Sequence, residues 1–398
     1  MASDIIEFYR EKTVLVTGGT GFLGKMLTEK LLRTCAVDRV YLIVRPKKGL
    51  SPEERVQSLF EEPVFEKLKE KNPSCIKKVL AIEVSTAYSN CYEKYIEEKF
   101  YETPIDPELL IKITEELKPN ILNSVSSGLI GIWPNPYVFS KAVAENLLLT
   151  KGNHLPVALF RPTIVTSAAS EPLPGWSDNL YGPLGILLSS HCGILRVVRA
   201  NGNIKSHTVP GDMCINAMLC FAWDTNNKKS APSAEENFLP PVLNFSGRNS
   251  KLLIPMKQYV DFSRIEFPPF KRAMWHQILF LVEGEYAYRM AKFVLHTIPA
   301  YLIDSLLVVS YKKTKRLYAK LDKTSDVLRY FLLNEWDIDN ENVLNLWQKL
   351  NDNDKAAFNF DINTIDVNTY FKNLIIGLKK YILKEDMTKA KFHRQRYK

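Results

Sequence analysis

The sequence lacks the cysteine patterns of a disulfide-bonded or zinc-binding protein. Its six cysteines are scattered, with no CxxC pair and no paired Cys/His spacing; they stand at positions 35, 75, 91, 192, 214 and 220. We therefore expect free thiols in a reducing compartment and no metal site. Residues 1–12 are polar and contain no apolar core of a signal peptide, so secretion is not expected.

A second lack is an uninterrupted apolar run of bilayer-spanning length, which takes about 20 residues. The most apolar stretch, 293–311, is broken by a histidine, a proline and an aspartate. We interpret it as a helical hairpin that packs in a core, forms a wall for an acyl chain, or contacts a membrane from one side. Basic clusters at 312–316 and 379–398 favour peripheral contact with an anionic cytosolic membrane surface, although plain solvated surface is the alternative.

Acidic residues are in the minority. The chain of 398 residues has 53 Lys and Arg against 44 Asp and Glu, a net charge of +9. This excess suits anionic partners such as a phosphorylated cofactor, coenzyme A or an acidic membrane surface. No basic stripe alternates with aromatic residues, so no nucleic-acid partner is expected. The length predicts two domains, and 46% hydrophobic with 24% charged residues excludes wholesale disorder.

The chain is organised around a glycine-rich turn. A β-type run at 13–16 leads into the turn, and apolar residues recur at helical spacing over 22–33. In such a unit Gly18 permits the tight turn, Gly21 lets the backbone approach a pyrophosphate, and Gly24 lets helix and strand pack closely. The start of the helix would hold the phosphate charge. The candidate cofactor-binding residues of this turn are Gly18, Thr20, Gly21, Phe22, Leu23 and Gly24.

Basic residues follow the second expected strand, a buried one at 39–44. At this place in a dinucleotide-binding fold an acidic residue selects NAD, whereas basic residues accommodate the extra phosphate of NADP. Arg45, Lys47 and Lys48 occupy it here. They favour NADPH as the cofactor, and a solvated basic turn is the alternative.

Tyr137 and Lys141 stand four residues apart at the start of an expected helix, 137–150, so both side chains lie on one face. Such a pair also occurs by chance, but after a dinucleotide-type turn it indicates a functional site. The expected strand before it, 79–87, follows the turn too soon for a complete sheet. Parallel neighbours need a crossover of a dozen or more residues, so this strand must serve where a complete fold has three.

Seven stretches make the chain resemble the fatty acyl-CoA reductases, which are extended short-chain dehydrogenases/reductases with an added male-sterility-type C-terminal domain. The resemblance implies an α/β fold: a Rossmann-like, doubly wound parallel sheet lacking strands in domain 1–267, and a mainly helical domain in 268–398. The stretches are TGGTGFLGKMLTEKLLR (17–33), YLIVRPKKGLSPEERV (41–56), VSTAYSNC (84–91), WPNPYVFSKAVAENLL (133–148), RPTIV (161–165), EPLPGWSDNLYGPLGI (171–186) and FNFDINTIDVNTYFKNLIIGLKKYILKED (358–386).

The resemblance implies an oxidoreductase of lipid metabolism that reduces a long-chain fatty acyl-CoA with NADPH to a primary alcohol, through an aldehyde. Tyr137 would donate the proton, and Lys141 would lower the tyrosine pKa and hold the nicotinamide ribose. Thr86, with Ser85, would hydrogen-bond the substrate oxygen; satisfied hydroxyls at a strand end are the alternative. Arg161 would meet a coenzyme A phosphate or form a salt bridge. The expected location is the cytosolic face of the endoplasmic reticulum or peroxisome.

One departure from the family sets a second expectation. Members carry a long segment where this sequence passes directly from Ile82 to Val84, so the chain resembles a member with an internal deletion. The alternative function is therefore a catalytically impaired isoform or paralogue that retains lipid or membrane binding. The Pro- and Gly-rich stretch 171–185 is expected to be a substrate lid, and 225–236 an exposed loop.

Overall fold

The computed structural model describes residues 2–44, 52–71, 85–151, 157–229, 239–263, 276–306 and 313–386. Arg45, Lys47, Lys48 and the Ile82–Val84 junction lie outside these ranges, as does the predicted boundary at residue 267. The chain forms two compact units. Unit 1 comprises 1–174, 207–250 and 336–365, and unit 2 comprises 175–206, 251–335 and 366–398. Each unit draws on both sides of residue 267, and the division there stays a prediction.

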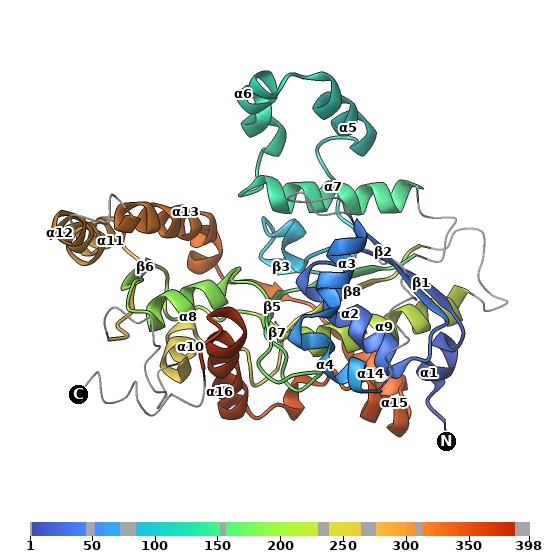
Figure 1. Cartoon of the computed structure of the whole chain (residues 1–398). Helices are drawn as coiled ribbons and strands as arrows, with labels where there is room; N and C mark the ends of the chain where they lie inside the picture. Colours follow the sequence, from blue (N-terminus) through green and yellow to red (C-terminus); the bar gives the residue numbers. More distant parts are fainter. Residues whose placement is uncertain are drawn as a thin grey trace. The chain divides into compact units, whose positions relative to one another are not determined.

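Unit 1 contains parallel strand pairs and helices (Figure 1). Its strands are β1 (Thr13–Thr17), β2 (Arg39–Ile43), β3 (Tyr95–Ile96), β4 (Leu159–Pro162), β5 (Ile164–Thr166), β7 (Thr208–Pro210), β8 (Val242–Phe245) and β10 (Asp337–Ile338). Its helices are α1 (Asp4–Tyr9), α2 (Phe22–Thr34), α3 (Pro52–Phe60), η1 (Pro63–Phe65), α4 (Glu66–Lys71), η3 (Ala87–Asn90), α5 (Pro107–Glu116), α6 (Pro119–Ile130), α7 (Pro136–Lys151), α9 (Gly211–Lys229), α14 (Glu341–Lys349), α15 (Asp352–Ala357) and η5 (Ile362–Thr364).

The described strands pair in parallel, two at a time: β1 with β2, β4 with β8, β5 with β7, and β3 with β10 in unit 1. Parallel pairing between strands that alternate with helices confirms the α/β class with Rossmann-like topology. The predicted elements at the glycine turn, at 39–44, at 137–150 and at 242–245 are all present. The predicted loop at 225–236 is wrong over its first residues, because α9 continues to Lys229.

The segment at Ser85 lies beside β4. The N–H groups of Leu159 and Thr163 donate to the Pro241 and Phe245 carbonyls, at the two ends of β8, whereas the Phe160 carbonyl, on the other edge of β4, accepts the Ser85 N–H at 3.2 Å. The prediction of strand through residue 87 is wrong at its described end, because Ala87 begins the 3₁₀ helix η3. Among the described strands, none pairs with both β1 and β4, so the described sheet is interrupted between these two strands.

One face of the β1–β2 pair is uncovered. Strand β1 alternates between exposed and buried residues, and Leu15 and its register partner Tyr41 are 40% and 50% exposed. Strands at the centre of a doubly wound sheet are buried on both faces, so the prediction of a buried strand at 39–44 is wrong for this face. The helices of a complete second half would cover it.

Unit 2 is mainly helical. Its core joins buried side chains of β6, α10 and α13, namely Val198, Val260 and Leu332. Among the helices that the structure describes, none is both long and apolar enough to cross a membrane. Its elements are α8 (Pro183–His191), β6 (Val197–Arg199), α10 (Met256–Ser263), β9 (Phe280–Val282), α11 (Glu285–Lys292), the π-helix η4 (Phe293–Thr297), α12 (Ile298–Leu306), α13 (Lys313–Leu333), α16 (Val367–Gly377) and the π-helix η6 (Leu378–Ile382).

Buried charges fix the end of α2 to the root of the predicted lid. Glu171 accepts hydrogen bonds from Lys30 Nζ at 2.5 Å, Arg33 Nη2 at 2.8 Å and Asn216 Nδ2 at 3.0 Å. Burial alone would raise the pKa of Glu171, but the Lys30 ammonium, these hydrogen bonds and the Arg33 guanidinium together lower it to about 2.

The five described cysteines are free thiols, as predicted, and the structure shows that all five are buried.

Glu171→Gln should lower the free energy of unfolding at neutral pH by up to about 3 kcal/mol. The folded pKa of about 2 lies below the ordinary 4.5. Ionised Glu171 therefore stabilises the fold fully above pH 4.5, and this contribution is lost as the pH falls toward 2. Urea unfolding across this window should show a shallower pH dependence for the variant. The control is Glu7→Gln, since Glu7 and Arg10 form an exposed pair. Identical curves for both variants would contradict the prediction.

Candidate active site

The glycine-rich turn has the geometry of a phosphate-binding loop. Gly18 has a φ of +67°, which a glycine adopts without strain, and its carbonyl accepts the Gly21 N–H at 2.8 Å. Gly21 is the N-cap of α2 and supplies no side-chain cap. A helix start of this kind presents backbone donors and the positive end of the dipole to an anion.

Gly24 is required by a close backbone approach. A Cβ atom on Gly24 would lie 2.4 Å from the Gly18 carbonyl oxygen and 2.6 Å from the Gly19 Cα atom. The first turn of α2 therefore lies directly against the loop, with no room for a side chain. These contacts fit the cradle in which a dinucleotide pyrophosphate is held, as the sequence predicts.

Arg55 adds a basic group that the sequence analysis missed. It stands in the first turn of α3, and its Nη2 donates to Thr20 Oγ1 at 3.2 Å. The position of Arg55 one turn into the helix after β2 is the signal that could have identified this residue.

Phe22 and Leu23, also predicted for the site, are half-buried in the first turn of α2.

The hydroxyls of Ser85 and Thr86 already have protein partners. Thr86 Oγ1 accepts the Tyr88 N–H at 3.3 Å and donates to the Pro162 carbonyl at 3.4 Å. Ser85 Oγ donates to Glu145 Oε1 at 2.6 Å. In this structure the two side chains have the satisfied hydroxyls that the sequence analysis left as the alternative.

Tyr137 and Lys141 both project from α7, but their surroundings differ. The Tyr137 side chain is largely exposed, whereas Lys141 is half-buried and lines a cavity. Desolvation raises the pKa of Tyr137 above that of a free tyrosine. The predicted lowering of this pKa by Lys141 is therefore wrong here, because partial burial of the phenol outweighs any attraction from a cation one helical turn away.

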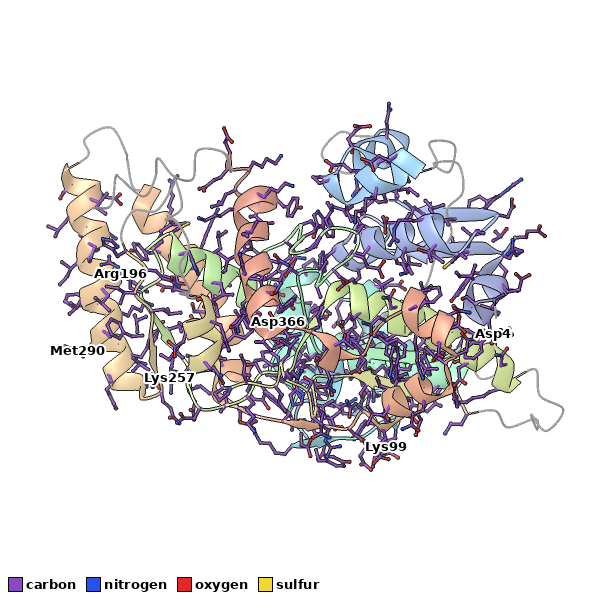
Figure 2. All side chains as sticks on the ribbon, turned by 90° about the horizontal axis from the view of Figure 1, so that it is seen from below. Asp4, Lys99, Arg196, Lys257, Met290 and Asp366 are labelled. Atoms are coloured by element: carbon purple, nitrogen blue, oxygen red, sulfur yellow. The ribbon has the colours of Figure 1, made fainter. Side chains whose placement is uncertain are left out.

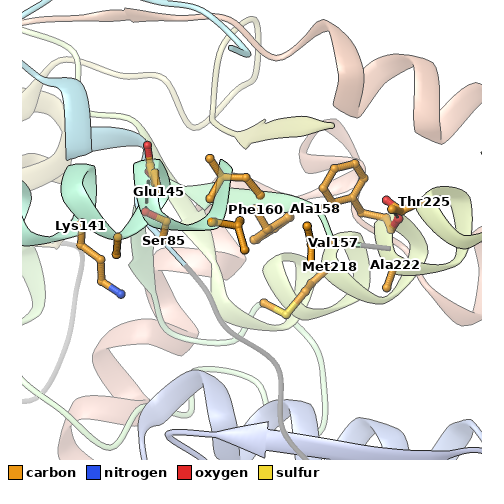
Figure 3. A pocket seen from close by; sticks show the side chains of 13 residues that line it. Ser85, Lys141, Glu145, Val157, Ala158, Phe160, Met218, Ala222 and Thr225 are labelled. Atoms are coloured by element: carbon orange, nitrogen blue, oxygen red, sulfur yellow. Dashed lines mark hydrogen bonds between the residues drawn. The ribbon is translucent and has the colours of Figure 1, made fainter. Parts of the chain in front are cut away.

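The cavity is about 370 Å³ in volume and lies between α7, β4 and α9. Figure 3 shows Ser85, Lys141 and Glu145 at one end and Ala222 and Thr225 at the other. Most of the wall between them is apolar. Its described lining residues are Ser85, Lys141, Ala144, Glu145, Leu148, Val157, Ala158, Leu159, Phe160, Met218, Phe221, Ala222 and Thr225.

A buried ion pair joins α7 to β4. Arg161 is fully buried, and its Nη2 and Nε donate to Glu145 Oε2 and Oε1 at 2.7 and 3.1 Å. Glu145 Oε1 also accepts the hydroxyl of Ser89 at 2.8 Å, and Arg161 Nη1 donates to the Lys99 carbonyl at 2.9 Å. Of the two expectations for Arg161, the salt bridge is observed, and its burial leaves no surface for a coenzyme A phosphate.

Glu145 was not identified from the sequence. It follows Tyr137 and Lys141 at the same four-residue interval, so the three positions share one face of α7. That repeat was the available signal. The structure thus brings together Lys141, Glu145, Ser85 and Arg161, and separately the glycine turn with Arg55.

Glu145→Leu and Arg161→Leu should each lower the free energy of unfolding by about 3–5 kcal/mol, because each leaves one buried charge without its partner. The double variant should lose clearly less than the sum of the two single losses. Urea unfolding of all four proteins measures this coupling. The exposed pair Glu7 and Arg10 provides the control cycle, with an expected coupling of at most about 1 kcal/mol. Additive losses at Glu145 and Arg161 would contradict the assigned pair.

The chain is similar to named reductases over nearly its whole length. It is 32% identical to fatty acyl-CoA reductase wat of Drosophila melanogaster over 451 residues, covering 95% of this chain and 86% of that protein. It is 31% identical to fatty acyl-CoA reductase 1 of Homo sapiens over 455 residues, covering 96% and 87%. Both alignments are longer than the 398 residues of this chain, so both relatives contain positions without a counterpart here.

A solved structure with a similar fold is the terminal R domain of the myxalamid biosynthetic pathway, with a TM-score of 0.51 at 14% identity, covering 93% of this chain and 90% of that one. The reductase domain of a non-ribosomal peptide synthetase from Mycobacterium tuberculosis has a TM-score of 0.50 at 14% identity, covering 96% of each chain. At these identities the likeness shows the fold alone.

Two family models described as male sterility protein match the chain. The NAD-binding one matches in two segments, 16–83 and 74–218, and the other matches 295–385. These two matched ranges overlap at 74–83, next to the junction where the sequence predicts an internal deletion relative to the family. Together with the identity to named relatives over most of their length, these matches show that the chain belongs to the fatty acyl-CoA reductase family.

Proposed function

We propose that the chain binds NADPH and reduces a long-chain fatty acyl-CoA to the primary alcohol through the aldehyde. The observation that carries this proposal is the cradle formed by Gly18, Gly21 and Gly24 at the start of α2, in a chain of the reductase family. A long acyl chain partitions into membranes, and the net charge of +9 suits anionic lipid. We therefore propose the cytosolic face of the endoplasmic reticulum or peroxisome as the place of reaction.

The residues of the turn fit the cofactor. The pyrophosphate would lie against the backbone of the turn at Gly21, and Gly24 lets the first turn of α2 pack against this loop. Arg55 is a described basic residue that follows Arg45, Lys47 and Lys48 in the chain, and its contact with Thr20 brings it to the turn. When bound, NADPH supplies the hydride for each of the two reductions.

The proposed proton donor is the Tyr137 hydroxyl. A phenol is protonated at neutral pH, which is the form that gives a proton to a carbonyl oxygen. Desolvation raises the pKa of Tyr137, which makes it a weaker acid than a free tyrosine and opposes this role. Lys141 would hold the nicotinamide ribose. Ser85 and Thr86 would hydrogen-bond the carbonyl oxygen only by exchanging Glu145 and the Pro162 carbonyl as partners, which weakens their contribution relative to hydroxyls held ready for the substrate.

A second candidate is a catalytically impaired member that retains lipid or membrane binding, and it rests on the described strands, none of which pairs with both β1 and β4. The glycine turn follows strand β1, and the Ser85 segment lies along the edge of β4 that does not pair with β8. In a complete fold another strand lies between them and fixes their separation. Without it, a misplacement of about 1 Å between the reacting groups is enough to cost about 100-fold in rate.

Arg45→Asp should weaken NADPH binding by about tenfold or more and leave NADH binding within about twofold, because only NADPH carries the additional phosphate. Titration of tryptophan fluorescence with each nucleotide measures both affinities. The matched control is Arg10→Asp, which makes the same charge change at an exposed arginine paired with Glu7. Equal affinity of the unaltered chain for NADPH and NADH would contradict the assignment to NADPH.

The purified chain should produce fatty alcohol from palmitoyl-CoA and NADPH at a rate about 100-fold below that of a version with the missing segment restored from a relative. Gas chromatography of the alcohol measures both rates. In the restored version Tyr137→Phe should lower the rate about 100- to 10,000-fold, which identifies the activity as that of this site. Equal production by the two chains would refute the impaired candidate, and an inactive restored chain would refute the proposed reductase.

A further inference from the structure

Helix α6 is poorly covered by its own unit. None of its 12 residues is buried, and among the described elements none packs closely along it. Figure 1 shows α5 and α6 on the far side of α7 from the strands of unit 1. Helices of about 12 residues are marginal in water without tertiary packing, and α6 is rich in asparagine, serine and β-branched residues, which are weak helix formers. α6 therefore requires a surface that packs against it.

One side of α6 presents a continuous uncharged face. Ile121, Ser124, Val125 and Gly128 stand at positions i, i+3, i+4 and i+7, which share one side of a helix. We call these four residues the α6 face. Ile121 and Val125 are 45% and 41% exposed. The Ser124 hydroxyl donates to the Ile121 carbonyl at 2.7 Å, so covering the α6 face leaves no side-chain donor without a partner.

The α6 face has a ridge beside a groove. Ile121 and Val125 form an apolar row four residues apart, and Ser124 and Gly128 form a parallel row with almost no side chain. A Cβ atom on Gly128 would meet no atom within 4 Å beyond the backbone of its own helix, so the groove is open in the single chain. Ridges of one helix pack into grooves of another. Because the α6 face has both, two copies of it are complementary to each other.

Charge favours the same partner. The sequence of α6 contains no Asp, Glu, Lys, Arg or His, whereas the whole chain has a net charge of +9. Two copies of equal positive charge repel each other, and this repulsion is smallest where the contact surface itself is uncharged. A charged partner protein would instead be matched by opposite charges on the docking face, and α6 offers none.

We propose that the α6 face joins two copies of this chain in a two-fold symmetric dimer. In such a contact the same residues of both copies meet, with the ridge of each α6 in the groove of the other. One helix face is a small interface, so we expect a dissociation constant of about 1–100 μM. The contact uses no residue of the proposed reductase site, so it stands or falls separately from the proposed function.

Sedimentation velocity of the full chain tests the proposal. Between about 1 and 200 μM the unaltered chain should pass from monomer to dimer. Val125→Glu should raise the dissociation constant by about 100-fold or more, because it places like charges opposite each other in the contact. Gly128→Leu should raise it by about tenfold or more, because the new side chain fills the groove that the second copy enters. A chain that stays monomeric over the whole range, or a dimer that Val125→Glu leaves intact, would overturn the proposal.

A mixture of Val125→Glu and Val125→Lys chains should recover the dimer to within about tenfold of the unaltered affinity, because opposite charges then meet. Such recovery requires that α6 of one copy contacts α6 of the other, and its failure would refute the two-fold contact. Met290→Glu is the control, because Met290, labelled in Figure 2, is 66% exposed on α11 in unit 2. It should dimerise like the unaltered chain. Thermal unfolding of the monomers by circular dichroism should show no loss of stability in any variant, since the altered residues are exposed.

Discussion

The buried ion pair between Glu145 and Arg161 is the interaction on which the arrangement of unit 1 depends most. It joins the helix that carries Tyr137 and Lys141 to the strand beside which the Ser85 segment lies. Neither charge is exposed to water, so neither is stable there without the other. The hydroxyl of Ser85 completes the same network. The elements proposed to do the chemistry are therefore held to one another independently of the glycine turn.

The second constraint is the interruption of the sheet. A parallel sheet is stable when each inner strand has neighbours on both edges and helices on both faces. The β1–β2 pair keeps its register over five residues, yet Leu15 and Tyr41 remain exposed on one face. The glycine turn persists because its contacts are local, between residues 18 and 24. Over the ranges that the structure describes, no strand pairs with both β1 and β4 to set the relation of that turn to α7.

Prediction from the sequence succeeded where the local structure is determined by residues close in the sequence. The turn at Gly18, the helix after it and strand β8 follow from glycine placement and apolar periodicity within a few residues. It failed where the exposure or the partner of a side chain is determined by residues far away in the sequence. The exposure of Tyr41 depends on which elements cover that face of the β1–β2 pair, and the pairing of Arg161 with Glu145 depends on the packing of a helix on a strand. Periodicity also could not show that α9 continues past Thr225, since its last turn is polar.

Helix α2 has a different significance when its two ends are considered together. Its start carries the phosphate cradle, and its last two turns carry Lys30 and Arg33, which grip Glu171. The helix of 13 residues is a rod about 20 Å long. The turn proposed to hold the phosphate and the residues that bind Glu171 therefore belong to one straight element, so the first residue of the proline-rich stretch is tied to the same helix as that turn.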